Sequence, residues 1–344
     1  MTLPRIDKDL QVFLFVVALA LIVLVAFWGV FDMVILGASL AVVLVPLYHR
    51  LTKRIPALLS AFLVTLGVLL VVVAVAYVTF LIMSDNSGVL TSLFSTIGTW
   101  LADPSTHPEA FGIPLAKETL SSWLATGESL FLNYGATVMR NLGLVVFKGF
   151  VFLFSLFIIL VKGEELKNRV FRHLPGPVKR YCVQLESVTV DTLYVIYIVQ
   201  IAIAVLTFFI AIPVFYFLGY GNVLFYSFLA AFCELIPILG SSVAFIVIGA
   251  YSLAIGDMKG VFILFVFGYL IVSAMPEVYI RPVLVGRRVK IHPVIMFVGL
   301  IGGLLTMGLA GFVLGPLLIV LLMRSYRIWT DERKTGREAG VPGR

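Results

Sequence analysis

The sequence contains little charge. Only 12% of its 344 residues are Asp, Glu, Lys or Arg, whereas 61% are hydrophobic and the mean hydropathy is +1.11. A typical soluble domain carries about 25% charged residues. So few charges cannot cover the surface of a soluble globule, and the sequence therefore predicts an all-α polytopic membrane protein. The apolar runs are long, whereas an outer-membrane barrel would show alternating segments of roughly ten residues.

Cysteine and the known catalytic motifs are also scarce. Cys182 and Cys233 are the two cysteines, and they form neither a disulfide framework nor a metal-ligand spacing. The sequence contains no phosphate-binding loop, nucleophile elbow or HExxH motif. It also lacks the Ser/His, paired-Asp or metal constellation that an intramembrane protease needs. We therefore expect neither an enzyme nor an ATP-driven pump, and no metal or cofactor.

Basic residues lie in short clusters between the apolar runs. The loops 48–54, 162–181 and 281–290 and the C-terminal tail are basic, whereas 84–141 holds five acidic and two basic residues. Loops rich in Lys and Arg stay in the cytoplasm. The pattern predicts a multi-pass protein of the plasma membrane (the inner membrane of a two-membrane cell) with both termini in the cytoplasm. It also explains the net charge of +7 without nucleic acid as a partner.

Apolar runs mark the expected membrane helices, because a span needs about 20 apolar residues. The runs lie at 10–28, 32–47, 56–83, 142–161, 192–218, 223–236, 241–255, 261–275, 292–308 and 309–323. Counting every run gives ten spans, and counting one short pair, 223–255 or 292–323, as a re-entrant hairpin gives eight. We favour about eight transmembrane helices, with one or more broken or re-entrant helices in the C-terminal half.

The runs divide the chain into five parts. They are transmembrane helices 1–3 at 1–83, an extracytoplasmic amphipathic segment at 84–141, the fourth span with a cytoplasmic amphipathic loop at 142–191, a C-terminal core at 192–323 and a cytoplasmic tail at 324–344. In the second part, Leu90, Leu93, Phe94 and Ile97 follow helical spacing. This stripe predicts a helix that lies on the membrane or on a neighbouring subunit.

Glycine and proline interrupt the apolar sequence between Pro276 and Pro316. The glycines there include Gly302, Gly303, Gly308, Gly311 and Gly315. Close helix packing would explain two or three of them. Five, followed by Pro316, favour a broken helix or a hairpin, which membrane proteins use where the backbone bends around a ligand path.

Glu234 stands at the end of an apolar run, three residues before Pro237. A carboxylate at membrane depth costs about 2.5–3.5 kcal/mol on insertion scales. One hypothesis makes it an ion- or proton-coupling group beside backbone that Pro237 unwinds. The alternative is an interfacial carboxylate that caps the next helix.

Glu277 and Arg281 are four residues apart and can pair on one helix face, which Pro282 then ends. The pair is either a charge contact that opens during transport or a structural salt bridge in a cytoplasmic loop. His292, before Pro293, is either a proton relay or an ordinary interfacial histidine.

Polar residues recur every three positions at the start of the fifth run. They are Asp191, Tyr194, Tyr197 and Gln200. The stripe predicts a water-accessible path or a subunit contact, with interface anchoring by the tyrosines as the alternative. Two isolated charges lie nearer the N-terminus. We expect Asp32 to cap a helix, and Lys148 to pair across helices or to snorkel.

Several short motifs, in this order and spacing, resemble the autoinducer-2 exporter family of bacterial and archaeal membrane proteins. They are Tyr197-Ile-Val-Gln200, Glu234-Leu-Ile-Pro237-Ile-Leu-Gly240, Arg281-Pro282-Val-Leu-Val-Gly286, His292-Pro293, Gly302-Gly303 and Gly315-Pro316, with Lys162-Gly163-Glu164 and Leu174-Pro175 in the preceding loop. The segment after Gly286, with Arg287, Arg288 and Lys290, is more basic than the family pattern.

The resemblance implies a secondary transporter or exporter that works as a homo-oligomer. A pentamer is one of the oligomeric states that the resemblance allows. Members are linked to export of a small signalling molecule or to sodium–proton antiport, so the transported species is a small solute or a cation and the coupling ion H⁺ or Na⁺. The expected path residues are Tyr197, Gln200, Glu234, Pro237, Gly240, Glu277, Arg281, Pro282, Gly286, His292, Pro293, Gly302, Gly303, Gly315 and Pro316. A membrane scaffold in a complex and a passive channel are the alternatives.

Overall fold

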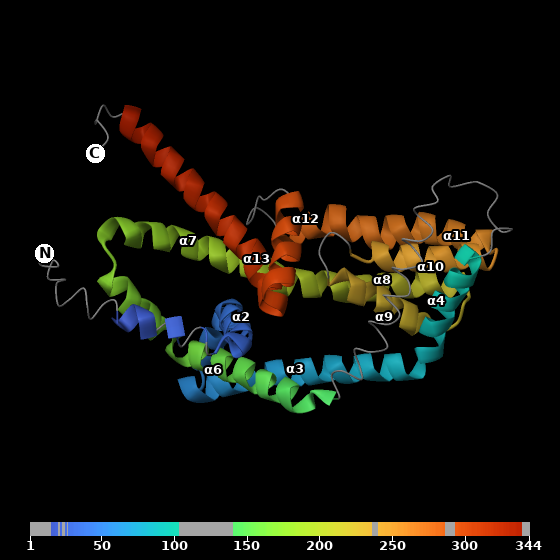
Figure 1. The fold of residues 1–344 in the computed structure, drawn as a ribbon, viewed down its shortest axis with the longest axis horizontal. Coiled ribbons are helices and arrows are strands. Elements are labelled where there is room, and N and C mark those ends of the chain that lie inside the picture. The colour runs from blue at the N-terminus through green and yellow to red at the C-terminus, as the bar shows by residue number, and fades with distance from the viewer. Residues whose placement is uncertain are drawn as a thin grey trace, which may run out of the picture.

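The structure is a computed structural model, and it describes residues 15–19, 21–22, 25, 27–102, 140–235, 240–285 and 293–338. Within these ranges all regular secondary structure is helical (Figure 1). Six helices in the described ranges are long and apolar enough to cross a membrane: Gly29–Thr52, Ala57–Asp85, Leu142–His173, Val178–Leu218, Met258–Ile280 and Ala310–Thr330. The all-α polytopic prediction is confirmed. About half of the expected run at 10–28 lies outside the described residues, so the number of eight spans stays a prediction.

The N-terminal helices form one packed group. They are α2 (Trp28–Thr52), α3 (Ala57–Asp85) and α6 (Leu142–His173). Ala41, Ala61 and Leu156 are fully buried where the three helices meet. Small side chains allow this close approach, which is how helices associate in lipid. The outer face of α3 is apolar and exposed, as a surface against lipid or another subunit would be.

The polar segment 162–181, expected as a loop, is mostly helix. α6 continues to His173, and α7 (Gly176–Tyr194) begins after the turn at Leu174 and Pro175. An ion pair one turn apart, Arg169 to Glu165 at 2.8 Å, supports the helical extension. α7 then runs through η1 (Val195–Val199) into α8 (Gln200–Leu218).

Two short helices after α8 form a hairpin. α9 (Val223–Glu234) and α10 (Ser242–Ala254) have 12 and 13 residues, or roughly 18–20 Å at 1.5 Å per residue. A bilayer core is about 30 Å thick, so neither helix crosses it alone. Tyr220 and Asp257 hydrogen-bond where the two chain ends meet, and Glu234 bonds Ser241 at the tip. We call residues 223–254 the first hairpin.

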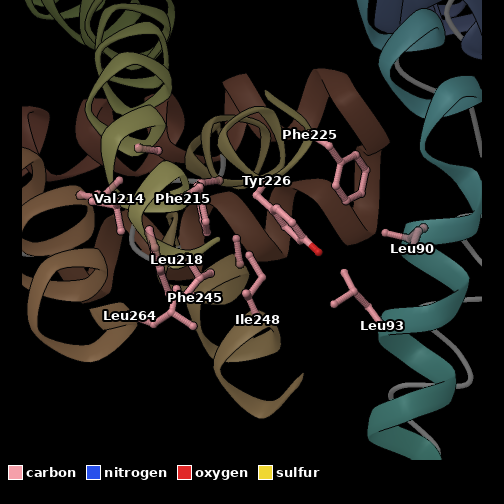
Figure 2. Close-up of a cluster of buried hydrophobic side chains, with 14 residues drawn as sticks. Leu90, Leu93, Val214, Phe215, Leu218, Phe225, Tyr226, Phe245, Ile248 and Leu264 are labelled. Carbon is pink, nitrogen blue, oxygen red and sulfur yellow. The ribbon is translucent and has the colours of Figure 1, made fainter. Parts of the chain in front are cut away.

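α4 (Ser87–Ala102) covers the first hairpin from the side. Leu90 and Leu93 point at Phe225 and Tyr226, as Figure 2 shows. The apolar stripe of 84–102 therefore packs on its own chain, and the expectation that it lies on the membrane or another subunit is wrong for these residues. A tertiary contact competes with lipid for the same apolar face. The rest of the amphipathic segment, 103–139, lies outside the described residues.

A single rod follows the first hairpin and packs between α8 and α10. It consists of α11 (Met258–Ile263), η2 (Leu264–Ala274), η3 (Pro276–Ile280) and α12 (Arg281–Val285). Phe215 and Phe245 stack beside it at 5.5 Å. Pro282 does not end the helix as expected: the rod continues through it to Val285.

α13 (Pro293–Glu338) contains a second hairpin, residues 293–323, that turns at Gly308. Gly308 has φ of 61° and ψ of −143°, which a residue with a side chain rarely adopts. The arms touch backbone to backbone: a Cβ on Gly303 would lie 2.0 Å from the Gly311 oxygen, and one on Gly315 would lie 1.9 Å from the Gly299 oxygen. The predicted break therefore falls at Gly308, and close packing accounts for four glycines around it.

Candidate functional site

The tip of the first hairpin places a carboxylate inside the protein. Glu234, the last residue of α9, is 1% exposed. Its Oε2 accepts a hydrogen bond from the backbone N–H of Ser241, at 2.7 Å, just before α10 begins. An anion at a helix N-terminus is stabilised by the unpaired N–H groups and the helix dipole. Glu234 is therefore buried at the tip and caps the next helix at the same time.

Gly240 makes room for that carboxylate. Its φ is 51°, in the left-handed region, and a Cβ there would lie 2.9 Å from Glu234 Oε2. Both the backbone conformation and the contact therefore favour glycine. Pro237, which was expected to unwind this turn, lies outside the described residues.

Arg281 approaches the same tip from the rod. Its Nε donates to Glu277 Oε2 at 2.7 Å, and its Nη1 donates to Gln200 Oε1 at 3.0 Å. Its Nη2 lies 3.7 Å from Glu234 Oε1, which is too far for a hydrogen bond, and it has no other acceptor among the described residues. The predicted Glu277–Arg281 pair thus forms on a helix rather than in a loop, and a second carboxylate stands next to it.

Gln200 connects three elements through one side chain. Its Oε1 accepts from Arg281, and its Nε2 donates to the backbone oxygen of Glu234. The residue is 4% exposed and follows directly on η1, where i→i+5 hydrogen bonding shifts the helix register. Such local π-turns often occur at functional sites.

Two serines complete the cluster. Ser241 Oγ and Ser273 Oγ are 2.7 Å apart, and both residues are buried. Sequence reasoning missed both of them, and their one signal is a hydroxyl inside a continuous apolar run. We call the set Gln200, Glu234, Ser241, Ser273, Glu277 and Arg281 the tip cluster. With both carboxylates ionised, its one guanidinium leaves a net charge of −1.

Other expected path residues lie elsewhere. The Tyr197 hydroxyl is 2.8 Å from Ser39 Oγ on α2, so it does not join the tip cluster. The second hairpin, which carries Gly302, Gly303, Gly315 and Pro316, instead borders η1, where its Met296 packs on Val195 and Val199. Pro282 and Pro293 lie in α12 and at the start of α13. Gly286 and His292 fall outside the described residues.

The described residues contain no group of three or more His, Cys, Asp and Glu side chains able to hold a metal ion. The tip cluster instead offers two carboxylates, an amide and two hydroxyls around one arginine. A carboxylate can take up a proton, and carboxylate and neutral oxygens together can coordinate a small cation. Because Arg281 balances the charge of one carboxylate, one further positive charge would neutralise the cluster.

Comparison with known proteins matches residues 13–331 to a family described as "AI-2E family transporter". A protein of Methanothermobacter thermautotrophicus, named "Putative transport protein", is 28% identical over 302 residues, which cover 86% of this chain and 87% of that protein. A similarly named protein of Methanocaldococcus jannaschii is 23% identical over 320 residues, covering 90% and 93%. One from Treponema pallidum is 28% identical over 199 residues, covering 57% and 48%.

Proposed function

Since the chain belongs to the AI-2E family of transporters, we propose that it is a secondary-active transporter whose coupling ion binds at the tip cluster. It exports a small solute or exchanges a monovalent cation for protons. The observation that carries the proposal is the position of Arg281, which is hydrogen-bonded to Glu277 while Glu234 stands 3.7 Å away.

The net charge of the tip cluster sets the stoichiometry. One proton or one sodium ion neutralises it, whereas a second would leave a buried positive charge without a partner. Protonation of Glu277 releases the Arg281 Nε bond, and the guanidinium then pairs with Glu234. The cluster thus has two arrangements, and the ion selects between them by its differential affinity.

These arrangements differ in how the first hairpin is held. Glu234 caps α10, and the Gln200 side chain holds the last carbonyl of α9. A move of Arg281 from Glu277 towards Glu234 would strain both the Glu234–Ser241 contact and the Gln200 contact. The ion therefore acts on the position of the hairpin tip against α8 and the rod, which is the displacement that a carrier needs for alternating access.

The remaining features complete the proposal. The basic segments 48–54 and 162–181 support an orientation in a plasma membrane with both termini in the cytoplasm. The exposed apolar face of α3 is available to lipid or to a second copy, in keeping with a homo-oligomer. The activity needs neither an enzymatic step nor a cofactor.

Flux measurements in proteoliposomes test this function. We expect an imposed sodium or proton gradient to drive movement of the other ion, or of a small solute, through the purified protein. Glu234→Gln should abolish the dependence on the gradient, while Glu165→Gln, which removes an exposed carboxylate of α6, should leave it unchanged. Flux that is indifferent to an opposing gradient would identify a passive channel. No flux under any gradient, with no cellular effect of Glu234→Gln, would leave a scaffold role.

A further inference from the structure

A second ion pair lies between the N-terminal helices. Lys148 Nζ of α6 donates to Asp32 Oδ2 of α2 at 2.9 Å. The two side chains are 29% and 23% exposed. The pair joins two spans that also share a hydrogen bond from Ser155 Oγ to the Val34 oxygen, and the tip cluster does not include it. Lys148 therefore pairs across helices rather than snorkelling.

The pair lies towards the ends of the two spans that are far from the basic segments. Counting from Lys162 and His49, where those segments begin, Lys148 and Asp32 are roughly 21 Å and 25 Å away at 1.5 Å per residue. Asp32 is the fifth residue of α2 and Lys148 the seventh of α6, so the pair lies in the outer part of a hydrocarbon core of about 30 Å. Charged pairs inside the core are rare, and they mark solute and ion pathways.

The turn of the second hairpin reaches the same level. Met307 stands about 21 Å from Pro293 along the first arm. Together with Thr306 and Ala310 it lines a cavity of about 210 Å³, whose other wall includes Asp32 and Lys148. This volume is large enough for several water molecules or a small solute. The ion pair therefore faces a cavity beside the Gly308 turn, in addition to joining two helices.

We propose that this cavity is a second binding station for the transported solute, and that the solute is polar but carries no net charge. The proposal deepens the proposed function and rests on it. The tip cluster has a net charge of −1, which suits a coupling cation, whereas Asp32 and Lys148 cancel. A solute with both a hydrogen-bond donor and an acceptor can donate to Asp32 and accept from Lys148, in place of the ion pair. Lys148 would repel a cation and Asp32 would repel an anion, so the site disfavours both kinds of ion.

The two stations lie towards opposite membrane faces. The tip cluster adjoins Ile280, where the span that starts at Met258 ends on the basic side. The second station lies more than about 20 Å from that side by helix length. Each hairpin therefore enters the membrane from one face and places its turn beside a charged cluster near the other face. In this structure Asp32 and Lys148 are bonded to each other, so a solute must separate the two side chains before it can bond both.

Cysteine labelling tests the station without any flux. Ala310→Cys, at a position that lines the cavity and is 1% exposed, is made in a Cys182→Ser, Cys233→Ser background, and a membrane-impermeant thiol reagent is added to right-side-out vesicles. We expect Asp32→Asn and Lys148→Met each to raise the labelling rate about tenfold or more, because each removes a charged hydrogen bond. The charge-swapped variant, Asp32→Lys with Lys148→Asp, should return the rate towards the starting value. Thr79→Cys, on the exposed face of α3, should not respond.

Protection of Ala310→Cys tests the solute class. Glycerol and glycine, one uncharged and one zwitterionic, should slow labelling in the Ala310→Cys protein, whereas choline and acetate at equal osmolarity should not. Glycine protecting alone would narrow the class to zwitterions, and glycerol alone to hydroxylated solutes. Unchanged labelling in both single-charge variants, or protection only by choline or acetate, would overturn the station. Gradient-driven flux that persists in that case would leave the proposed function intact. Absent flux together with the expected labelling and protection would remove the transport role and leave a solute-binding site at the cavity.

Discussion

At the scale of single residues, Arg281 is the group on which the tip cluster depends. Its three nitrogen atoms have three different neighbours: Glu277, Gln200 and Glu234. A lysine ammonium is a single charge and cannot span the three. We expect Arg281→Lys to lower gradient-driven flux at least about tenfold, which corresponds to one lost charged hydrogen bond. Flux in proteoliposomes is the measurement, Arg169→Lys on exposed α6 is the control, and equal flux in both variants would contradict the role of the guanidinium.

Gly240 gives a second prediction at this scale. Gly240→Ala forces a side chain into the left-handed region and against Glu234 Oε2, so we expect a loss of about 1–2 kcal/mol in unfolding free energy. Ion coupling should weaken together with stability, because the carboxylate must move. Gly249→Ala, in α10 with open space around it among the described residues, serves as the matched control. Thermal unfolding in detergent compares them, and equal midpoints would argue against the contact.

The opposite end of the first hairpin gives a pH prediction. The Tyr220 hydroxyl lies 2.7 Å from Asp257 Oδ2 and 2.8 Å from Ser252 Oγ. Hydrogen bonds from the Gly260 backbone and from Tyr220 hold the pKa of Asp257 below its usual value. Burial, in the first place, raises the pKa of Tyr220 to about 12. The Asp257 contribution is thus complete above about pH 4 and is lost as the pH falls below it, and the Tyr220 contribution is complete below about pH 10.

Tyr220→Phe should therefore lower the melting temperature by a constant amount between about pH 5 and pH 9. The difference from the unchanged protein should shrink as the pH approaches 3, because Asp257 is then protonated in both. Tyr216→Phe, at a ring that is 70% exposed, should have no effect at any pH. A difference that grows towards acid pH would show that another group dominates.

Part of the tip cluster can be predicted from sequence spacing, and part cannot. The four-residue interval of Glu277 and Arg281 indicates their pairing, because it places both on one helix face. The contacts to Gln200 and Ser241 join residues far apart along the chain, and no local pattern encodes them. The register shift in η1 and η2 also breaks the 3.6-residue periodicity on which such patterns depend.

At the scale of elements, the second hairpin depends on two glycine pairs. Gly303→Ala would push a methyl group to 2.0 Å from the Gly311 oxygen, and backbone cannot move aside as a side chain does. We expect a loss of about 1–3 kcal/mol or a failure to assemble. The neighbouring Gly302 has nothing within 4 Å of its added Cβ among the described residues, so Gly302→Ala should be tolerated. The unfolding midpoints of the two variants test this prediction, and equal losses of stability would contradict the backbone contact between the arms.

Hairpins and extensions differ in how well the sequence predicts them. The breaks near Gly240 and Gly308 follow from glycine, proline and short apolar runs, which local chemistry explains. The helical extension of α6 to His173 does not, because polarity alone does not distinguish an exposed helix from a loop. The Glu165–Arg169 pair, four residues apart, is the signal that charge counting overlooked.

At the scale of the whole molecule, the arrangement predicts which residues face each side of the membrane. Lys53 follows α2 in a basic segment, and Lys259 is the second residue of the rod, at its opposite, Tyr220 end. In the cysteine-free background, an impermeant thiol reagent outside intact cells should label Lys259→Cys and not Lys53→Cys. Permeabilised cells, where both should react, provide the control. Labelling of Lys53→Cys in intact cells would reverse the orientation.

The burial of Glu234 beside Arg281 also constrains the order in which the chain enters the bilayer during synthesis. The ribosome delivers the first hairpin well before it delivers Arg281. Until then the tip carries an anion without its cation, and helices of 12 and 13 residues are too short to be inserted as spans. We therefore expect the first hairpin to enter the bilayer only after the rod has inserted beside α8.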